Sequence, residues 1–333
     1  MKAVINERAI TVEPGETLLQ AALRQGIDFP HSCRVGGCAT CKCKLIHGRV
    51  KQLTHTEYIL SDEDLDQGFI LACQSIPRSD VGITVDMGRD GARRKVTGRV
   101  IGQDRLTHDI LRLRVQLDES LPYKAGQYAL LSIASLPGEV RSYSFATRAR
   151  PDAQAFFFVR KVPGGAFSGH VHEHDLVGRM LTVEGPFGDF WMRPAATPLI
   201  LIAGGSGLAP VLALLEDGVT ARVTRPVTLL FGARAQRDLY ALDTISELAR
   251  RWGNRFEFLP ILSEEPNDSS WQGARGWVTD GIADDLQPDS HAYLCGPPRM
   301  IDAATEVLLA RGLSRGQIHA DRFTTQHDTQ ALA

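Results

Sequence analysis

The sequence lacks a long apolar run and an excess of charge of either sign. No segment reaches the ~18 consecutive apolar residues that a membrane-spanning helix needs, so we expect no membrane association. Lys and Arg total 37 against 39 Asp and Glu, and this net charge of −2 does not favour nucleic acid as a partner. Residues 1–19 lack the apolar core of a signal peptide. We therefore expect a cytoplasmic protein.

Cysteine is scarce, with six residues, but four of the six lie between Cys33 and Cys43. An even count is compatible with disulfides, yet disulfide scaffolds are short and secreted. In a cytoplasmic chain of ordinary globular composition, clustered cysteines indicate metal binding or redox chemistry.

A length of 333 residues allows two or three domains at ~150 residues each. We expect three, at residues 1–90, 94–194 and 195–333. The Gly-rich, charged segment Met87–Lys95 has no apolar period and marks a linker between the first two.

In the first block, a helix is expected to begin at Thr17, where Gln20 completes a capping box, and to end at Gly26. The strands expected around it are Lys2–Ile5, Ala9–Val12 and Lys42–Ile46.

The second block contains closely spaced strands punctuated by Gly and Pro, which favours an antiparallel β-barrel. They are Val96–Ile101, Ile110–Val115, Gln127–Ile133, Ser142–Ala146, Ala155–Val162 and Met180–Val183. In the third block apolar strands alternate with helices, which indicates a doubly wound parallel sheet. Its strands are Leu199–Ala203, Val227–Phe231, Phe256–Leu262 and Ala292–Leu294, and its helices are 208–216 and 299–311.

Cys33, Cys38 and Cys41 have the C-x4-C-x2-C spacing of a plant-type [2Fe–2S] site, and Cys73 supplies the distant fourth ligand. Gly36 and Gly37 permit the tight backbone that three converging thiolates require. A zinc knuckle is the alternative, but a second C-x2-C pair is missing. Cys43 is better explained as a strand cysteine packed as a small hydrophobe than as a substitute ligand.

Two motifs in the second block suit a flavin. The segment Arg141-Ser142-Tyr143-Ser144 offers a cation, an aromatic face and a hydroxyl, with Arg141 and Tyr143 on one face of a strand. Residues Gly164-Gly165-Ala166-Phe167-Ser168 precede a helix-like segment, whose free N–H groups suit a pyrophosphate. Each motif alone also fits an ordinary strand or turn.

Two Gly-rich turns follow strands in the third block. The first turn is Gly204-Gly205-Ser206-Gly207, followed by Pro210. Its glycines let a dinucleotide approach the backbone at a helix N-terminus. Cys295-Gly296-Pro297 form the second turn, at the carboxyl edge of the sheet where ligands bind in open α/β folds. Arg234 and Arg237 follow the second strand, where ribose discrimination is expected, and both are placed to meet a 2′-phosphate.

Taken together and in this order, these motifs resemble the ferredoxin–NADP⁺ reductase superfamily, preceded by a plant-type ferredoxin domain. Nearly the whole chain is similar to the reductase components of bacterial oxygenases, such as those of benzoate and naphthalene dioxygenases and of methane and phenol monooxygenases. The resemblance implies a β-grasp ferredoxin domain, an antiparallel β-barrel for FAD and a doubly wound parallel-sheet domain for NAD(P)H.

The resemblance also implies residue roles. Arg141 binds FAD phosphate, Tyr143 packs on the isoalloxazine, Ser144 approaches its N5 atom, and residues 164–168 hold the FAD pyrophosphate. The turn at 204–210 holds the nicotinamide dinucleotide, and residues 295–298 line the nicotinamide site. Phe323 matches the C-terminal aromatic that stacks on the flavin, although ten residues follow it here.

The implied activity is transfer of a hydride from NADH to FAD and of single electrons through the [2Fe–2S] cluster to a separate oxygenase or its ferredoxin. The expected oxygenase is a Rieske ring-hydroxylating dioxygenase or a di-iron monooxygenase. The resemblance favours NADH over NADPH, because the similar reductases mostly take NADH and often carry a Gly-Ala-Arg followed by Asp, here Asp238. We expect a monomer. Two alternatives remain at this point: a reductase for a deoxysugar dehydratase, and a redox-sensing protein without turnover. Arg34, Val35 and Ala39 flank the cysteines and are candidates for the electron exit.

Overall fold

The structure of the protein, a computed structural model, describes residues 1–27, 29–31, 36, 40–54, 56, 60, 62–85 and 94–323. The chain forms two compact units, one containing the described residues up to 85 and the other residues 94–323. The predicted linker ends earlier than expected, because Arg94 and Lys95 already pair with Gly185 and Glu184 in a sheet. The boundary near residue 194 remains a prediction.

The first unit is a mixed sheet with strand order β2-β1-β7-β3-β5, in which β1 runs parallel to β7. The strands are β1 (Lys2–Ile5), β2 (Arg8–Thr11), β3 (Lys42–His47), β5 (Phe69–Leu71) and β7 (Val81–Thr84). A second, two-stranded sheet pairs β4 (Val50–Gln52) with β6 (Ser75–Pro77). The helices are α1 (Leu18–Arg24), α2 (Asp62–Asp66) and the short 3₁₀ turn η2 (Ala72–Gln74).

Helix α1 begins as the sequence predicts. The Gln20 main-chain N–H donates to the Thr17 hydroxyl at 3.2 Å, and the Thr17 N–H donates to the Gln20 side-chain oxygen at 2.9 Å. Leu18, Leu19 and Ala22 of this helix are buried against the sheet. A helix packed on a mixed sheet is the β-grasp arrangement that the resemblance implied.

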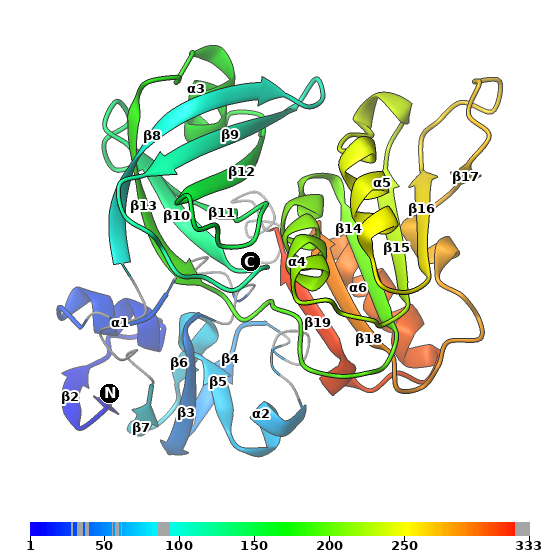
Figure 1. Ribbon diagram of the computed structural model, residues 1–333. Coiled ribbons are helices and arrows are strands. Elements are labelled where there is room, and N and C mark those ends of the chain that lie inside the picture. The colour runs from blue at the N-terminus through cyan, green and yellow to red at the C-terminus, as the bar shows by residue number, and fades with distance from the viewer. Residues whose placement is uncertain are drawn as a thin grey trace. The chain divides into compact units, whose positions relative to one another are not determined.

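The second unit opens with an antiparallel sheet of order β11-β10-β13-β8-β9-β12. A bridge between Phe145, just after β11, and Phe157 of β12 brings the two edge strands together, so the sheet curls into a barrel (Figure 1). The strands are β8 (Arg94–Arg105), β9 (Ile110–Leu117), β10 (Tyr128–Ile133), β11 (Val140–Ser144), β12 (Gln154–Arg160) and β13 (Met180–Phe187). Helix α3 (Ala166–Glu173) covers one end, with Phe167 and Val171 in the barrel core.

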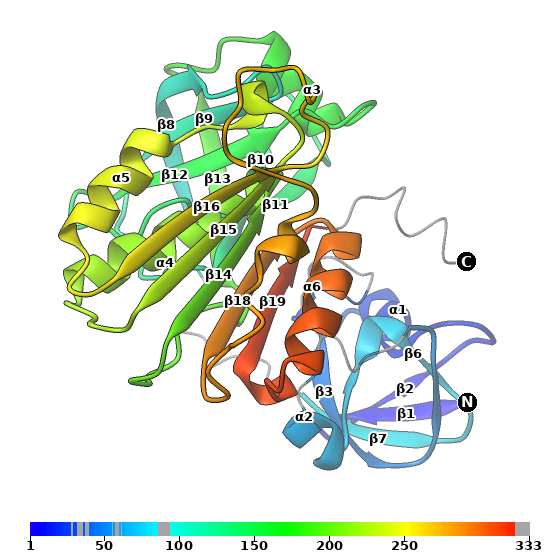
Figure 2. The same cartoon turned by 90° about the vertical axis from the view of Figure 1, so that its right-hand side faces the viewer.

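The chain then forms a parallel sheet of order β17-β16-β15-β14-β18-β19. Its strands are β14 (Leu199–Gly204), β15 (Val227–Ala233), β16 (Phe256–Leu262), β17 (Ala274–Arg275), β18 (His291–Gly296) and β19 (Ile318–Arg322). Helices α4 (Leu208–Thr220) and α5 (Leu242–Arg251) share one apolar core, and α6 (Pro298–Ala310) belongs to another (Figure 2). The sheet is therefore doubly wound, as predicted.

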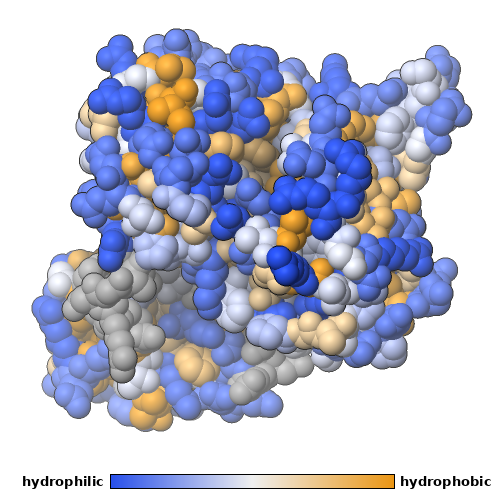
Figure 3. Space-filling model, in the orientation of Figure 1, coloured by the Kyte–Doolittle hydropathy of each residue, from blue (hydrophilic) through white to orange (hydrophobic). Residues whose placement is uncertain are grey.

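No helix in the described part of the chain has the length and apolar character needed to cross a membrane. The face shown in Figure 3 is mostly hydrophilic, with apolar residues in small groups.

A pair of histidines lies at the amino-terminal end of β18 and β19. The imidazole of His319 stacks on Tyr293 with ring centroids 4.7 Å apart, and its Nε2 lies 3.4 Å from Nδ1 of His291. Burial, followed by the positive charge of Arg193 and by His291, lowers the pKa of His319 from 6.5 to about 4. His319 is therefore neutral in the folded protein at neutral pH.

We expect the second unit to lose stability as the pH falls from about 6.5 toward 4. In that window the unfolded chain binds a proton at His319 that the folded chain does not, so acid favours unfolding, by up to about 3 kcal/mol at the lower end. His319→Gln removes this proton uptake and should flatten the dependence. The measurement is urea unfolding at several pH values, followed by tryptophan fluorescence, because Trp191, Trp252, Trp271 and Trp277 all lie in the second unit.

The exposed His174→Gln serves as the matched control and should keep the wild-type dependence. An unchanged pH dependence in His319→Gln would contradict the assignment.

Candidate functional site

Two of the four predicted cluster ligands lie together in the first unit. Cys41 precedes β3 and Cys73 lies in η2; both side chains are buried, and the Cys73 main-chain N–H points at the Cys41 sulfur over 3.5 Å. The adjacent Gly36 has a φ of +79°, which favours glycine. Cys33, Cys38 and the candidate exit residues Arg34, Val35 and Ala39 lie outside the described residues. The convergent pair of buried thiols fits a thiolate-bound cluster.

Cys43 is packed in the core of the same unit, 1% exposed, on β3 beside Ile70 of β5. Burial, with a smaller effect of Cys73, raises the pKa of the Cys43 thiol to about 12. The side chain is thus a neutral, apolar packing group, as the sequence suggested.

The Arg-Ser-Tyr-Ser motif occupies β11, the edge strand of the barrel. Arg141 forms an ion pair with Glu139 at 2.6 Å, and Tyr143 packs against Phe167 with ring centroids 5.3 Å apart. Ser142 is exposed, whereas Ser144 at the strand end is 6% exposed. A cation, an aromatic ring and a hydroxyl are therefore displayed along one short strand, which is the set a flavin nucleotide requires.

The second flavin motif forms the start of α3, with Gly165 as N-cap. Gly164 has a φ of +70°, and the Ser168 hydroxyl accepts the Val162 N–H at 3.1 Å. Gly164 and Ala166 are exposed. Phe167 is buried, and it packs in the barrel core.

The end of β11 meets the carboxyl end of the parallel sheet. The Ser144 hydroxyl lies 3.5 Å from a carboxylate oxygen of Asp321 on β19, and Asp321 is the register partner of Cys295 on β18. Burial, and the charge of Asp321, raise the pKa of the fully buried Cys295 thiol well above its ordinary value. The structure thus brings the predicted Ser144 and Cys295 to one place and adds Asp321, which the sequence analysis missed.

The two Gly-rich turns of the parallel sheet pack on one another. A Cβ on Gly207 would lie 2.2 Å from the Cys295 carbonyl oxygen, and one on Gly204 would lie 2.4 Å from the Met300 sulfur. Gly205 has a φ of +55°, and the buried Tyr240 hydroxyl donates to its carbonyl at 2.9 Å. Only glycine fits this close backbone approach, which leaves a cradle at the start of α4 for a dinucleotide.

The remaining residues of these turns have defined places. Ser206 lies in the 3₁₀ turn before α4, and Pro210 is buried in the first turn of that helix. Gly296 ends β18, and Pro297 is the N-cap of α6. The main-chain N–H of Phe323 donates to the Gly296 carbonyl at 2.9 Å, so Phe323 follows β19 at this same edge.

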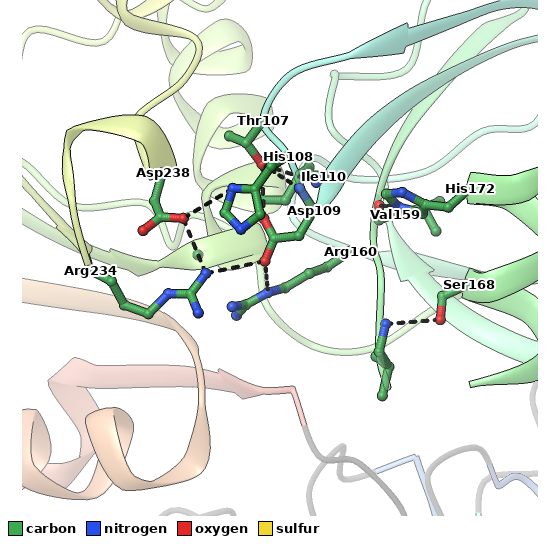
Figure 4. A network of polar contacts seen from close by, with 12 residues as sticks. Thr107, His108, Asp109, Ile110, Val159, Arg160, Ser168, His172, Arg234 and Asp238 are labelled. Atoms are coloured by element: carbon green, nitrogen blue, oxygen red, sulfur yellow. Dashed lines mark hydrogen bonds and ion pairs between the residues drawn. The ribbon is translucent and has the colours of Figure 1, made fainter. Parts of the chain in front are cut away.

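A chain of ion pairs joins the barrel to the parallel sheet beside the cradle (Figure 4). Asp109, in the β8–β9 turn, contacts Arg160 of β12 at 3.0 Å and Arg234 at 3.4 Å. Arg234, just after β15, also contacts Asp238 at 3.1 Å, and Asp238 lies 3.6 Å from His108. Burial opposes ionisation of Asp109, but the Thr107 hydroxyl and Arg160 outweigh it and lower its pKa.

Arg160 is the second residue that the sequence analysis missed. A Cβ on Gly205 would lie 3.1 Å from the Arg160 guanidinium, so this cation lies next to the turn that is predicted to hold the pyrophosphate. It belongs to a barrel strand with no recognised motif, and no sequence pattern connects it with a turn 45 residues later. The possible ligand atoms of His108, Asp109 and Asp238 lie within 4.8 Å of one another, as in a metal site. The carboxylates of this cluster are already paired with Arg160 and Arg234, which neutralise their charge.

The first unit has buried cysteines on a β-grasp fold, and the second has a barrel and a parallel sheet that carry the flavin and dinucleotide motifs. These features together define an iron–sulfur flavoprotein reductase. Comparison with known families agrees: residues 4–78 match the 2Fe-2S iron-sulfur cluster binding domain, residues 97–191 the oxidoreductase FAD-binding domain and residues 201–306 the oxidoreductase NAD-binding domain.

Several relatives extend over nearly the whole chain. The xylene/toluene monooxygenase electron transfer component of Pseudomonas putida is 44% identical, over 94% of this chain and 90% of the relative. The phenol 2-monooxygenase reductase component of Pseudomonas sp. strain CF600 is 38% identical, over 96% and 92%. The crystal structure of an Amycolatopsis cytochrome P450 reductase superposes with a TM-score of 0.72 at 34% identity, covering 97% and 99%.

The chain belongs to the family of ferredoxin–flavin–nicotinamide reductases that serve as electron-transfer components of oxygenases. It is an oxidoreductase whose cofactors are FAD and a [2Fe–2S] cluster and whose electron donor is a nicotinamide dinucleotide.

We expect Gly207→Ala to destabilise the second unit by about 1–3 kcal/mol, because the added methyl group meets the Cys295 carbonyl in a packed turn. The measurement is the urea unfolding midpoint followed by tryptophan fluorescence. Gly169→Ala is the matched control: Gly169 lies inside α3 with no atom within 4 Å of the added carbon, so alanine should be neutral or stabilising. Equal stability of the two variants would show that the turns are not tightly packed.

Proposed function

We propose that the protein carries electrons from NADH to a monooxygenase that hydroxylates an aromatic hydrocarbon. The convergence of Ser144, Cys295 and Asp321 at the end of β11 carries the redox part of this proposal. The names of the two monooxygenase relatives support the partner class. A deoxysugar dehydratase remains the alternative partner.

We assign the flavin to β11 and the start of α3. In this arrangement Arg141 binds phosphate, Tyr143 packs on the ring system, Ser144 faces its reactive edge, and residues 164–168 hold the pyrophosphate. Arg141 already has a carboxylate partner, Glu139, so binding of a phosphate would exchange one anion for another. Bound FAD supplies the change from two-electron to one-electron transfer, and the protein residues hold its rings in place.

We assign the nicotinamide dinucleotide to the cradle of Gly204, Gly205 and Gly207. The helix α4 N-terminus and the Arg160 guanidinium provide positive charge for its pyrophosphate. Cys295, Gly296 and Pro297 line the nicotinamide end, and Phe323 closes the same edge. Ser144, Cys295 and Phe323 are the proposed catalytic residues, and the neutral Cys295 thiol packs beside the ring without adding charge.

The proposed cluster ligands are Cys33, Cys38, Cys41 and Cys73. We further propose three domains, at residues 1–90, 94–194 and 195–333, a monomeric state, and the cytoplasm, where NADH is available.

The ion pairs of Arg234 bear on whether NADH or NADPH is the electron donor. Its guanidinium contacts two carboxylates, Asp109 and Asp238, so its charge is already neutralised. A 2′-phosphate at this position would also meet the Asp238 carboxylate, whereas a ribose hydroxyl would not be repelled by it. We therefore propose NADH as the donor.

Asp238→Asn should raise the ratio of kcat/KM for NADPH to that for NADH by about tenfold, because loss of one charge close to a phosphate changes the binding free energy by about 1.4 kcal/mol or more. The asparagine oxygen can still accept the Ala235 N–H that Asp238 accepts at 3.0 Å, so the turn should persist. The measurement is steady-state ferricyanide reduction with each donor.

The exposed Asp243→Asn, on the nearby helix α5, is the control and should leave the ratio unchanged. A wild-type protein that uses both donors equally, or an Asp238→Asn variant with the wild-type ratio, would contradict the NADH assignment.

The partner proposal is tested by reconstitution. The purified protein, NADH and the terminal component of an aromatic-hydrocarbon monooxygenase should convert the hydrocarbon to its hydroxylated product with NADH consumed in step. Parallel mixtures contain a Rieske dioxygenase component or a pyridoxamine-phosphate dehydratase. Faster turnover with either of these, while cytochrome c reduction by the protein is rapid, would replace the proposed partner. Slow cytochrome c reduction in a fully loaded protein would instead favour the redox-sensing alternative.

A further inference from the structure

Gln74 directly follows the proposed cluster ligand Cys73 and is buried with it. Its side chain is 7% exposed, although it carries an amide that would ordinarily face water. Leu71 and Ala72, just before it, are fully buried apolar residues. A polar side chain in such surroundings requires hydrogen-bond partners.

The amide of Gln74 finds them on Cys73. Its Nε2 atom donates to the Cys73 carbonyl at 3.0 Å and lies 3.7 Å from the Cys73 sulfur, within the range of an N–H···S hydrogen bond. The carbonyl settles the orientation of the amide, because only the NH₂ group can donate to it. The second hydrogen of the same NH₂ group is then available to the sulfur.

The chain holds this side chain from two sides. The main-chain carbonyl of Gln74 accepts the Leu53 N–H at 2.8 Å next to the β4–β6 sheet. A Cβ on Gly36 would lie only 2.7 Å from Cγ of Gln74, so the glycine leaves room for the glutamine stem against the cysteine loop. The position of the amide is thus set by packing as well as by its hydrogen bonds.

The same unit aims a second N–H at a ligand sulfur. The main-chain N–H of Cys73 points at the Cys41 sulfur at 3.5 Å. Main-chain donors are present whatever the sequence, but the Gln74 amide is a side chain that a substitution can remove.

We propose that Gln74 is a positioning residue that raises the reduction potential of the cluster by donating a hydrogen bond to the Cys73 sulfur. A cluster that accepts one electron gains one negative charge, shared with its sulfur ligands. An N–H dipole aimed at one of those sulfurs stabilises the reduced state more than the oxidised one. The proposal rests on Cys73 as a ligand, and it holds for any oxygenase partner.

Gln74→Leu tests the proposal in the full-length protein loaded with FAD and cluster. Leucine keeps the buried volume and removes the donor. At a fixed applied potential, the ratio of reduced to oxidised cluster should fall about tenfold, which for a one-electron couple corresponds to about 59 mV. The readout is a redox titration followed by the electron paramagnetic resonance signal of the reduced cluster, with NADH-to-FAD reduction expected at the wild-type rate.

Gln52→Leu is the matched control. Gln52 lies on β4 of the same unit, pairs with Ser75 in the sheet, and bonds Thr56 instead of a cysteine. Its titration should coincide with that of the wild type. A loaded Gln74→Leu variant with the wild-type midpoint, or a Gln52→Leu variant with the same shift, would overturn the proposal.

A measurement on the wild-type protein does not depend on how well a variant folds. With glutamine labelled by ¹⁵N in its side-chain amide, pulsed electron paramagnetic resonance of the reduced cluster should detect a coupled ¹⁵N nucleus. Absence of that coupling would overturn the proposal. Cys73→Ser tests the ligand assignment separately, because a protein that keeps its wild-type cluster spectrum without the Cys73 thiol would refute the ligand and leave the NADH and partner proposals untouched.

Discussion

The meeting of the barrel strand β11 with the carboxyl end of β19 is the constraint on which the second unit depends. Ser144 ends the barrel strand, Asp321 lies on the parallel sheet, and 3.5 Å separates their oxygens. A hydride moves only when donor and acceptor atoms approach to about 3–3.5 Å. Two domains that bind two different dinucleotides must therefore bring their binding edges close together, and the contact between Ser144 and Asp321 joins the two strand ends.

The charges beside the Gly-rich cradle are paired with one another. Asp109 bridges Arg160 of the barrel and Arg234 of the sheet domain, and Asp238 holds Arg234 from the other side. The Arg160 guanidinium, already fixed by Asp109, loses less conformational entropy when a phosphate binds than a free side chain would. The carboxylates thus keep the arginines in position and prevent a surplus of positive charge.

Some of these features follow from local sequence and others do not. The capping box of α1, the glycines of the dinucleotide turn and the cysteine spacing are local patterns, and each predicts its own geometry. Asp321 and Arg160 depend on which strands become neighbours, and that is decided by packing over long sequence distances. Helix α5 was not predicted for another reason. Its N-cap is Ala241, which has a φ of +57° and makes no side-chain cap hydrogen bond, so the sequence carries no start motif there.

Cysteine illustrates how neighbours set the chemistry of one residue type. Cys295 is fully buried beside the carboxylate of Asp321, and both conditions disfavour a thiolate, so it remains a neutral packing group at the carboxyl edge of the parallel sheet. Cys41 and Cys73 are just as buried, yet N–H groups of Cys73 and Gln74 point at their sulfurs. Donors of this kind favour negative sulfur, which is the form that binds iron. Donors alone do not decide the outcome. A main-chain hydrogen bond from Ala72 also favours a negative sulfur at Cys43, yet burial outweighs it and raises the pKa of that thiol to about 12, so Cys43 stays neutral.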